Sequence, residues 1–356
     1  MNFDDMKETL TDLIKLYRKR GSSLRSQVNP LINKSGLITQ ASWNNTFTHL
    51  EQYEESEITR EQFSATIEAF RKDLFNKILY DNKFISIINK PSNYAEIKQC
   101  LEAFTSEPFD DINASKLIED EDEDCCYKSI SGSTTTYIFK KIRKYSVKED
   151  LKVSALKLEY QNDGYDKLFA YVDISLPCFD SIIMDDERKI IILAADLSSI
   201  FQVDNLRGAV ASLKTIIRKG SSEEVKISDK NTNFFPAIQK FYEEVIGNVK
   251  ELAFKTDDGV AHYENAKRGI SCIKDGDFHI GGTDVADIEA YKIRKTYSTS
   301  DVNQENSVYL VSSWYVLNGN LGERKLGEAT ISASSYKEFF VIVDKLLDWS
   351  ILNDEI

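Results

Sequence analysis

The sequence is poor in the residues that build the commonest catalytic motifs. Its 356 residues include only three histidines, five prolines and 15 glycines. Neither a GxSxG nucleophile turn nor a GxGxxG phosphate loop occurs, and no lysine follows the glycine cluster at 276–282 as a P-loop requires. These scarcities exclude serine hydrolases of the nucleophile-elbow type and the two common glycine-rich nucleotide sites.

The five cysteines are too irregularly spaced for a disulfide scaffold. They fall at 100, 125, 126, 178 and 272, an odd number without a CxxC pair, so a zinc ribbon is excluded as well. The first residues are acidic, and no run of 18 apolar residues occurs. We therefore expect a cytoplasmic protein without direct membrane insertion.

Basic residues are outnumbered by acidic ones. The chain has 45 Lys and Arg against 58 Asp and Glu, which gives a formal net charge of −13. This balance excludes nucleic-acid binding by bulk charge. Local clusters of Lys and Arg remain candidates for phosphate contacts, because such contacts depend on where the cations gather.

Hydrophobic periodicity divides the chain into a helical part and a mixed part. Apolar residues recur at spacings of three and four through the first hundred residues, which predicts helices, and from residue 134 the spacing changes to two, which predicts strands. Pro108, an acidic run at 119–124 and SGS at 131–133 interrupt both patterns. We predict an α+β fold with a helical N-terminal domain at 1–107, an acidic loop or linker at 108–133, and a domain of mixed or antiparallel sheet with packed helices at 134–356. The last domain could form two lobes, 134–255 and 256–356.

The mixed part contains further helix and strand signals. We expect helices at 205–219, at 232–254 and from 334 onward. Strands are expected at 134–142, 151–160, 168–176, 179–184, 189–194, 287–297, 307–317 and 326–333. A polar turn is expected at 185–188, and the Asn-Gly pair at 318–319 predicts a hairpin.

One triplet has the composition of a metal-dependent nuclease site. Glu187 and Lys189 form an ExK pattern, with Asp180 upstream on a preceding strand. Such sites use carboxylates to hold Mg²⁺ and a lysine to position the attacking water. The charged run at 185–188 is also typical of a solvated hairpin tip. The nuclease is therefore an alternative to a binding role. We expect no cofactor otherwise, and Mg²⁺ only under this alternative.

A zinc site is the other metal hypothesis, and the spacing is against it. His262, Cys272 and His279 are ten and seven positions apart, whereas structural zinc sites place two ligands within one turn or knuckle. A packed cysteine and two structural histidines explain the same residues.

Three groups of cations stand out from the acidic background. Arg207, Lys214 and Arg218 share one face of the helix expected at 205–219, and no acid occurs from 205 through 222. A second group lies on an expected strand and consists of Lys292, Arg294 and Lys295, and a third lies at 140–152. We interpret the first two as candidate nucleic-acid-binding residues. The alternative is that the helix cations complement the helix dipole and face solvent.

The region 179–218 resembles the KwaB subunit of the Kiwa anti-phage system and its relatives. The resemblance rests on FDSIIMDD at 179–186, on IIIL at 190–193, on Leu197 and Phe201, and on the helix that begins near Asp204. It implies a cytosolic defence component that multimerises, works with a membrane-embedded partner and engages DNA. It implies no catalytic residues in this chain.

The leading hypothesis is a binding or effector subunit of an anti-phage assembly that engages DNA through local basic ridges and also contacts a protein partner. We expect a homo-oligomer or a complex subunit, and the resemblance adds a membrane protein as a partner. The alternatives are the nuclease with Asp180, Glu187 and Lys189, and a protein scaffold without catalytic function.

Overall fold

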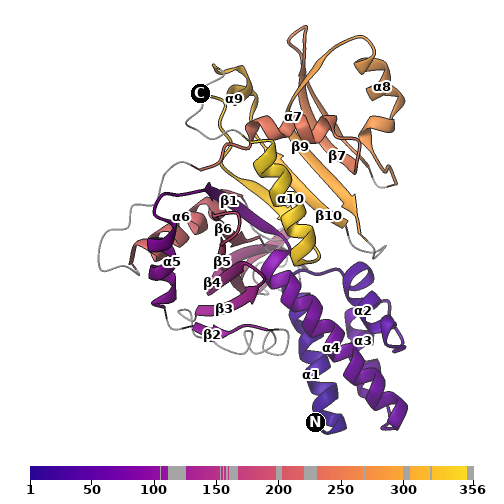
Figure 1. Ribbon diagram of the computed structural model, residues 1–356. Coiled ribbons are helices and arrows are strands. Elements are labelled where there is room, and N and C mark those ends of the chain that lie inside the picture. Colours follow the sequence, from indigo (N-terminus) through magenta and orange to yellow (C-terminus); the bar gives the residue numbers. More distant parts are fainter. Residues whose placement is uncertain are drawn as a thin grey trace.

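A single sheet runs through the protein (Figure 1). The computed structural model describes residues 1–104, 106–110, 126–152, 154, 156, 157, 159, 167–197, 203–219, 231–267, 269–299, 305–320 and 323–350. Within them, eleven strands pair in the order β2-β3-β4-β5-β6-β1-β11-β10-β9-β7-β8. The strands are β1 Lys83–Asn89, β2 Ser106–Pro108, β3 Cys126–Ser131, β4 Thr134–Leu151, β5 Leu168–Asp185, β6 Ile190–Asp196, β7 Asn248–Thr256, β8 Ala261–Asn265, β9 Ile288–Ser298, β10 Glu305–Val311 and β11 Ala329–Ser332. Among these described strands, only β2 and β3 pair in parallel.

The N-terminal helices form an arm to one side of the sheet (Figure 1). They are α1 Phe3–Lys19, the π-helical turn η1 Leu24–Val28, α2 Asn29–Lys34, α3 Trp43–Glu51 and α4 Glu57–Tyr80. Asn2 with Asp5, and Ser56 with Thr59, close capping boxes that fix where α1 and α4 begin. Their apolar stripes are buried against each other, as the helical spacing predicts.

The expectation that the first hundred residues are helical throughout is wrong at β1. This strand pairs with β6 over seven residues on one side and with β11 over three on the other. Six of its seven residues are buried. A central strand that is covered on both faces shows no alternation of apolar and polar residues, so its sequence pattern resembles that of a buried helix. The domain boundaries themselves stay a prediction.

Helices cover the two halves of the sheet differently. In the half formed by β2 to β6, α5 Tyr94–Glu102 and α6 Val203–Lys219 pack on one face and share a core with β1, β5 and β6. In the other half, α7 Phe235–Glu243 and α10 Tyr336–Asp348 pack on one face of β7, β9, β10 and β11, and Figure 1 shows them lying across these strands. The short elements η5 Ile273–Asp275, α8 Asp277–Thr283 and α9 Trp314–Asn318 complete this half.

The outcome for the remaining elements is mixed. The α+β fold, the helix α6 and the closing helix α10 are confirmed, and the polar turn forms at 186–189. The long helix expected at 232–254 is wrong, because α7 ends at Glu243 and residues 248–256 form β7. The Asn-Gly pair ends α9 instead of forming a hairpin. The acidic run at 119–124 lies outside the described residues. The strand expected at 151–160 is wrong, because β4 ends at Leu151 and none of the other described residues of that range is in a strand.

In the described parts of the chain, no helix has both the length and the apolar character that crossing a bilayer requires.

Candidate nucleic-acid interface

The half-sheet of β8, β7, β9 and β10 has a polar face opposite α7 and α10. Side chains alternate along these strands, so Val308 and Leu310 of β10 point into the core while Tyr309 points the other way. Register places Tyr309 beside Arg294 of β9, and Arg294 beside Glu251 of β7. Cations and tyrosines of four strands therefore share one face.

Glu251 organises the centre of this face. Its Oε1 lies 2.5 Å from Lys292 Nζ and accepts hydrogen bonds from the hydroxyls of Tyr263 at 2.6 Å and Tyr309 at 3.0 Å. Burial would raise the pKa of Glu251, but the hydrogen bonds from Lys292 and the two tyrosines outweigh it and the pKa is lowered. Lys292 Nζ also lies 5.0 Å from the ring centroid of Tyr263 and 5.5 Å from that of Tyr309. The two rings are thus held in place around an ion pair.

Arg294 is the exposed cation of this face. It lines a hollow of about 250 Å³ together with Lys250, Asn265 and Glu305. Within the described residues, the structure records no ion pair for Arg294. Its guanidinium can therefore accept a phosphate or carboxylate from a ligand without first losing an internal partner.

The predicted ridge on α6 exists as a helix face. Leu206, Val210, Leu213 and Ile217 are buried against the sheet, as their spacing predicts. Arg207 and Arg218 are exposed on the helix, and Arg207 Nε lies 3.9 Å from Glu328 Oε1, just before β11. Lys214 Nζ is less exposed and donates to Asn231 Oδ1 at 3.3 Å.

The α6 ridge and the β9 cations lie on the same side of the sheet. A row of paired residues runs from Arg294 through Tyr309 and Thr330 to Phe84. Paired residues point to the same face, and Phe84 packs in the core that α6 covers. Arg294 and Thr330 are two strand spacings apart, about 10 Å. The helix ridge therefore borders the polar face that carries Arg294.

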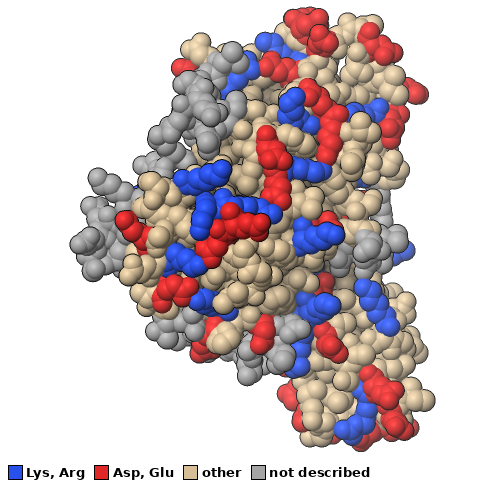
Figure 2. All heavy atoms as spheres, in the orientation of Figure 1, with Lys and Arg blue, Asp and Glu red and all other residues tan. Residues whose placement is uncertain are grey.

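Figure 2 shows the side of the molecule on which α7 and α10 lie, opposite the polar half-sheet face. On the side in view, Lys and Arg side chains are interspersed with Asp and Glu, with no single large basic field. The net charge of −13 likewise favours local basic contacts over a broad basic surface.

Lys295 does not belong to this surface. It is fully buried on the opposite face of β9, where Nζ donates to the carbonyls of Phe241 and Glu244 at 2.8 Å and pairs with the Glu244 carboxylate at 2.9 Å. Adjacent residues of a strand point to opposite faces, so Lys295 cannot act with Arg294. Its role here is to bind the C-terminal end of α7 to the sheet.

Two of the cations at 140–152, Lys140 and Arg143, are not available on the surface for a ligand. Lys140 is buried. Arg143 makes a bidentate ion pair with Asp180, with Nη2 at 2.7 and 2.6 Å from the two carboxylate oxygens. Lys144 and Lys152 are exposed.

The structure does not gather the nuclease residues. Asp180 is buried, accepts a hydrogen bond from the backbone of Asp196 at 2.9 Å and is neutralised by Arg143. Glu187 and Lys189 lie in the exposed turn between β5 and β6. Because Asp180 lies well inside β5, its carboxylate is on the order of 15–20 Å from that turn. Lys189 Nζ lies over the Tyr94 ring at 5.0 Å.

The histidines and cysteine considered for zinc have structural contacts. His279 is buried and bonds Glu264 through Nδ1 at 2.9 Å and the Tyr242 hydroxyl through Nε2 at 3.0 Å. His262 stacks on Phe254, and Cys272 Sγ accepts from the backbone of Val249. Among the described residues, no group of three His, Cys, Asp or Glu is arranged to hold a metal ion.

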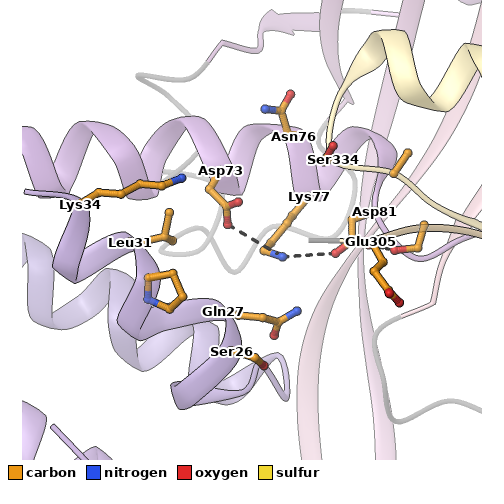
Figure 3. Close-up of a pocket in the computed structure, with 13 residues that line it drawn as sticks. Ser26, Gln27, Leu31, Lys34, Asp73, Asn76, Lys77, Asp81, Glu305 and Ser334 are labelled. Atoms are coloured by element: carbon orange, nitrogen blue, oxygen red, sulfur yellow. Dashed lines mark hydrogen bonds and ion pairs between the residues drawn. The ribbon is translucent and has the colours of Figure 1, made fainter. Parts of the chain in front are cut away.

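A separate polar cavity of about 110 Å³ lies where the helical arm meets the sheet (Figure 3). Lys77 of α4 points between Asp81, 3.3 Å away, and Asp73, 3.9 Å away. Asp81 also accepts a hydrogen bond from Ser332 of β11, and Asp73 one from Tyr17. These charges satisfy one another and tie α4 to α1 and the sheet.

Comparison with known proteins gives no match. Neither a protein-family model, nor a curated protein, nor a solved structure matches the chain. What the chain does is therefore inferred from its residues and their geometry.

The sequence pattern locates the cations of the interface and misses its tyrosines. Tyr263 and Tyr309 lie 46 residues apart in the chain, and only the pairing of four strands brings both to Lys292. The alternation at 261–265 indicates that Tyr263 and Glu264 face opposite ways, but no sequence pattern pairs Tyr263 with Glu251.

Proposed function

We propose that the chain is a cytoplasmic DNA-binding subunit of an anti-phage assembly. The observation that carries the DNA-binding part is that α6, with Arg207, Lys214 and Arg218, borders the polar half-sheet face with Lys292 and Arg294. The two cation groups, which are 74 residues or more apart in sequence, lie on one side of one sheet. Phosphate groups along a nucleic-acid strand suit such a discontinuous set of cations.

A binding role also agrees with how the charged residues are used. Asp180 is neutralised by Arg143, and Glu187 lies in a distant turn. The resemblance at 179–218 to the KwaB subunit supports the defence context, homo-oligomerisation and a membrane-protein partner.

The DNA-binding part is tested by the dependence of affinity on salt. Fluorescence anisotropy of a labelled duplex, measured between about 50 and 200 mM salt, gives the slope of log affinity against log salt. We expect the triple variant Arg207→Ala, Lys214→Ala, Arg218→Ala to flatten this slope by up to about 2.7, because each lost phosphate contact contributes about 0.9.

The control removes the same charge from another place. Lys15, Arg18 and Lys19 are three exposed cations of α1, and their triple alanine variant should leave the slope unchanged. If both variants flatten the slope equally, the binding follows net charge and the assignment to α6 is wrong. If the wild type binds neither duplex nor single-stranded DNA at low salt, the proposed function is wrong.

The defence context has its own test. Cells that express the chain with its genomic neighbours are challenged with phage, and plaques are counted for the wild type and the α6 variant. If the α6 variant has lost its DNA affinity but still lowers the number of plaques as the wild type does, defence does not depend on DNA binding and the combined proposal is wrong.

A further inference from the structure

Tyr263 is an exposed aromatic ring held in a fixed position. It lies on β8 with 58% of its surface accessible. Its hydroxyl donates to Glu251 at 2.6 Å, and Lys292 Nζ lies 5.0 Å from the ring centroid. Because Lys292 occupies one side of the ring, the accessible surface belongs mainly to the other side and the edges. A ring that is ordered before binding loses little conformational entropy when a flat ligand stacks on it.

The hollow beside Arg294 lies next to this ring. Register puts Tyr263 in line with Lys292, and Asn265 in line with Glu251 and Arg294. Two strand spacings and one two-residue step separate Tyr263 from Arg294, about 12 Å. Asn265 and Arg294 line the hollow, so a ligand that stacks on Tyr263 can extend one end toward the guanidinium.

The chemistry of this face fits a polyanion with flat, unpaired rings. Arg294 provides a cation without an ion pair to a described residue, and Lys250 lies in the same hollow. The Lys292 charge is matched by Glu251 at 2.5 Å, so it fixes the rings and adds little net charge. In a duplex the faces of the bases are covered by their neighbours, whereas a single strand exposes them to aromatic side chains.

We infer that the face of β8, β7, β9 and β10 binds single-stranded DNA, with a base stacked on Tyr263 and a phosphate at Arg294. The inference rests on the proposed DNA-binding function and adds the form of the nucleic acid and the residue that receives the base. The α6 cations then hold the strand where it leaves the sheet face.

The test compares single-stranded and duplex DNA on four proteins. An oligothymidylate of about 20 nucleotides and a duplex of the same length are titrated at about 150 mM salt. The variants are Tyr263→Ala, Tyr263→Phe and Tyr171→Ala. Tyr171 lies on β5 in the other half of the sheet and is also exposed, at 67%, which makes it a matched control.

We expect the wild type to favour the single strand. Tyr263→Ala should weaken single-strand binding at least about fivefold, the lower end of the contribution of one stacked base. Tyr263→Phe keeps the ring and loses only the hydroxyl, so it should stay within about twofold of the wild type, and Tyr171→Ala should have no effect. A single strand with photoreactive thymine analogues should crosslink to Tyr263.

Three results would overturn the inference. If Tyr263→Phe weakens binding as much as Tyr263→Ala, the loss comes from the contact with Glu251 and not from stacking. If the duplex binds as tightly as the single strand and Tyr263→Ala does not change the affinity, the single-strand assignment is wrong. The proposed DNA-binding function is still supported in that case if the α6 substitutions flatten the salt dependence of the affinity. If neither nucleic acid binds at low salt, both are wrong.

Discussion

The ion pair of Asp196 and Arg20 predicts a large loss of stability when its charge is removed. Asp196 ends β6 and is completely buried. Both of its carboxylate oxygens accept from Arg20 Nη2, at 3.1 and 2.9 Å, and one also accepts from the backbone of Phe179 at 2.8 Å. Arg20 directly follows α1, so this pair holds the helical arm to the sheet.

Asp196→Asn keeps the size of the side chain and removes its charge. Arg20, with 11% of its side chain exposed, and the fully buried Lys83 would then lack their shared counter-charge. Breaking a buried pair by removing one partner costs about 3–5 kcal/mol. With a urea m-value of about 3 kcal/mol/M for a chain of this size, the unfolding midpoint should fall by about 1 M or more.

Asp12→Asn is the matched control. Asp12 pairs with Lys15 on the surface at 2.9 Å, with side chains 56% and 61% exposed, and such pairs contribute about 0–1 kcal/mol. The assay is equilibrium urea unfolding followed by circular dichroism and by tryptophan fluorescence. If Asp196→Asn moves the midpoint no further than Asp12→Asn, the buried pair does not stabilise the fold and the reasoning is refuted.

The stability difference between the wild type and Asp196→Asn should also depend on pH. Burial raises the pKa of Asp196, but the charges of Arg20 and Lys83 and the bond from Phe179 outweigh it, and the folded-state pKa is lowered. A carboxyl whose pKa is lower in the folded state contributes stability above its unfolded pKa, about 3.9. The difference between wild type and Asp196→Asn should therefore be constant from pH 7 to pH 5 and shrink as the pH falls below about 4.

Three further predictions concern residues of β9 and β10. Lys295→Ala should lower the free energy of unfolding by about 3 kcal/mol, because it leaves buried acceptors of α7 unpaired, and should leave the salt slope of DNA binding unchanged. Arg294→Ala should have little effect on stability and should flatten the salt slope of single-strand binding by about 0.7, the contribution of one phosphate contact. Glu305→Gln should raise DNA affinity about twofold in anisotropy titrations, because Glu305 lines the hollow of Arg294 and a unit charge at about 8 Å in water contributes about 0.5 kcal/mol.

Helices with one buried stripe were predictable from the sequence. In α6 and α10, apolar residues at a period of 3.6 face a sheet, and both helices form where the pattern predicts them. The strand β1 could not be recognised in the same way, because its residues are buried on both faces and leave no polar side to read. The helical spacing of apolar residues continues from α7 into residues 248–254, which form β7, so spacing alone does not locate the end of α7 at Glu243.

The site was predictable as a set of cations and not as an arrangement. The period of two along a strand implies that Lys295 points away from Lys292 and Arg294, so that correction follows from the sequence alone. The partners were not accessible in this way. Lys292 pairs with Glu251, 41 residues earlier in the chain, and Asp180 pairs with Arg143, because of strand register. The register of each strand depends on the whole sheet. The sequence alone therefore does not distinguish a Lys or Arg that is paired with a carboxylate from one that is free to bind a ligand.

The position of β1 joins the sheet half that α6 covers and the half that carries the β9 cations into one continuous sheet. Through β1, hydrogen-bonded pairs continue from β6, on which α6 packs, to β11, β10 and β9. Once a DNA strand contacts one cation group, the other group is close to it, so the second contact forms at a high effective concentration. A flexible linker between two lobes would lower that concentration. A strand that touches both groups should therefore lose affinity on removal of either group, and the loss of log affinity for both together should be at least the sum of the two. If removal of either group alone leaves the affinity nearly unchanged and only removal of both lowers it, the two groups are alternative binding sites and do not share one strand.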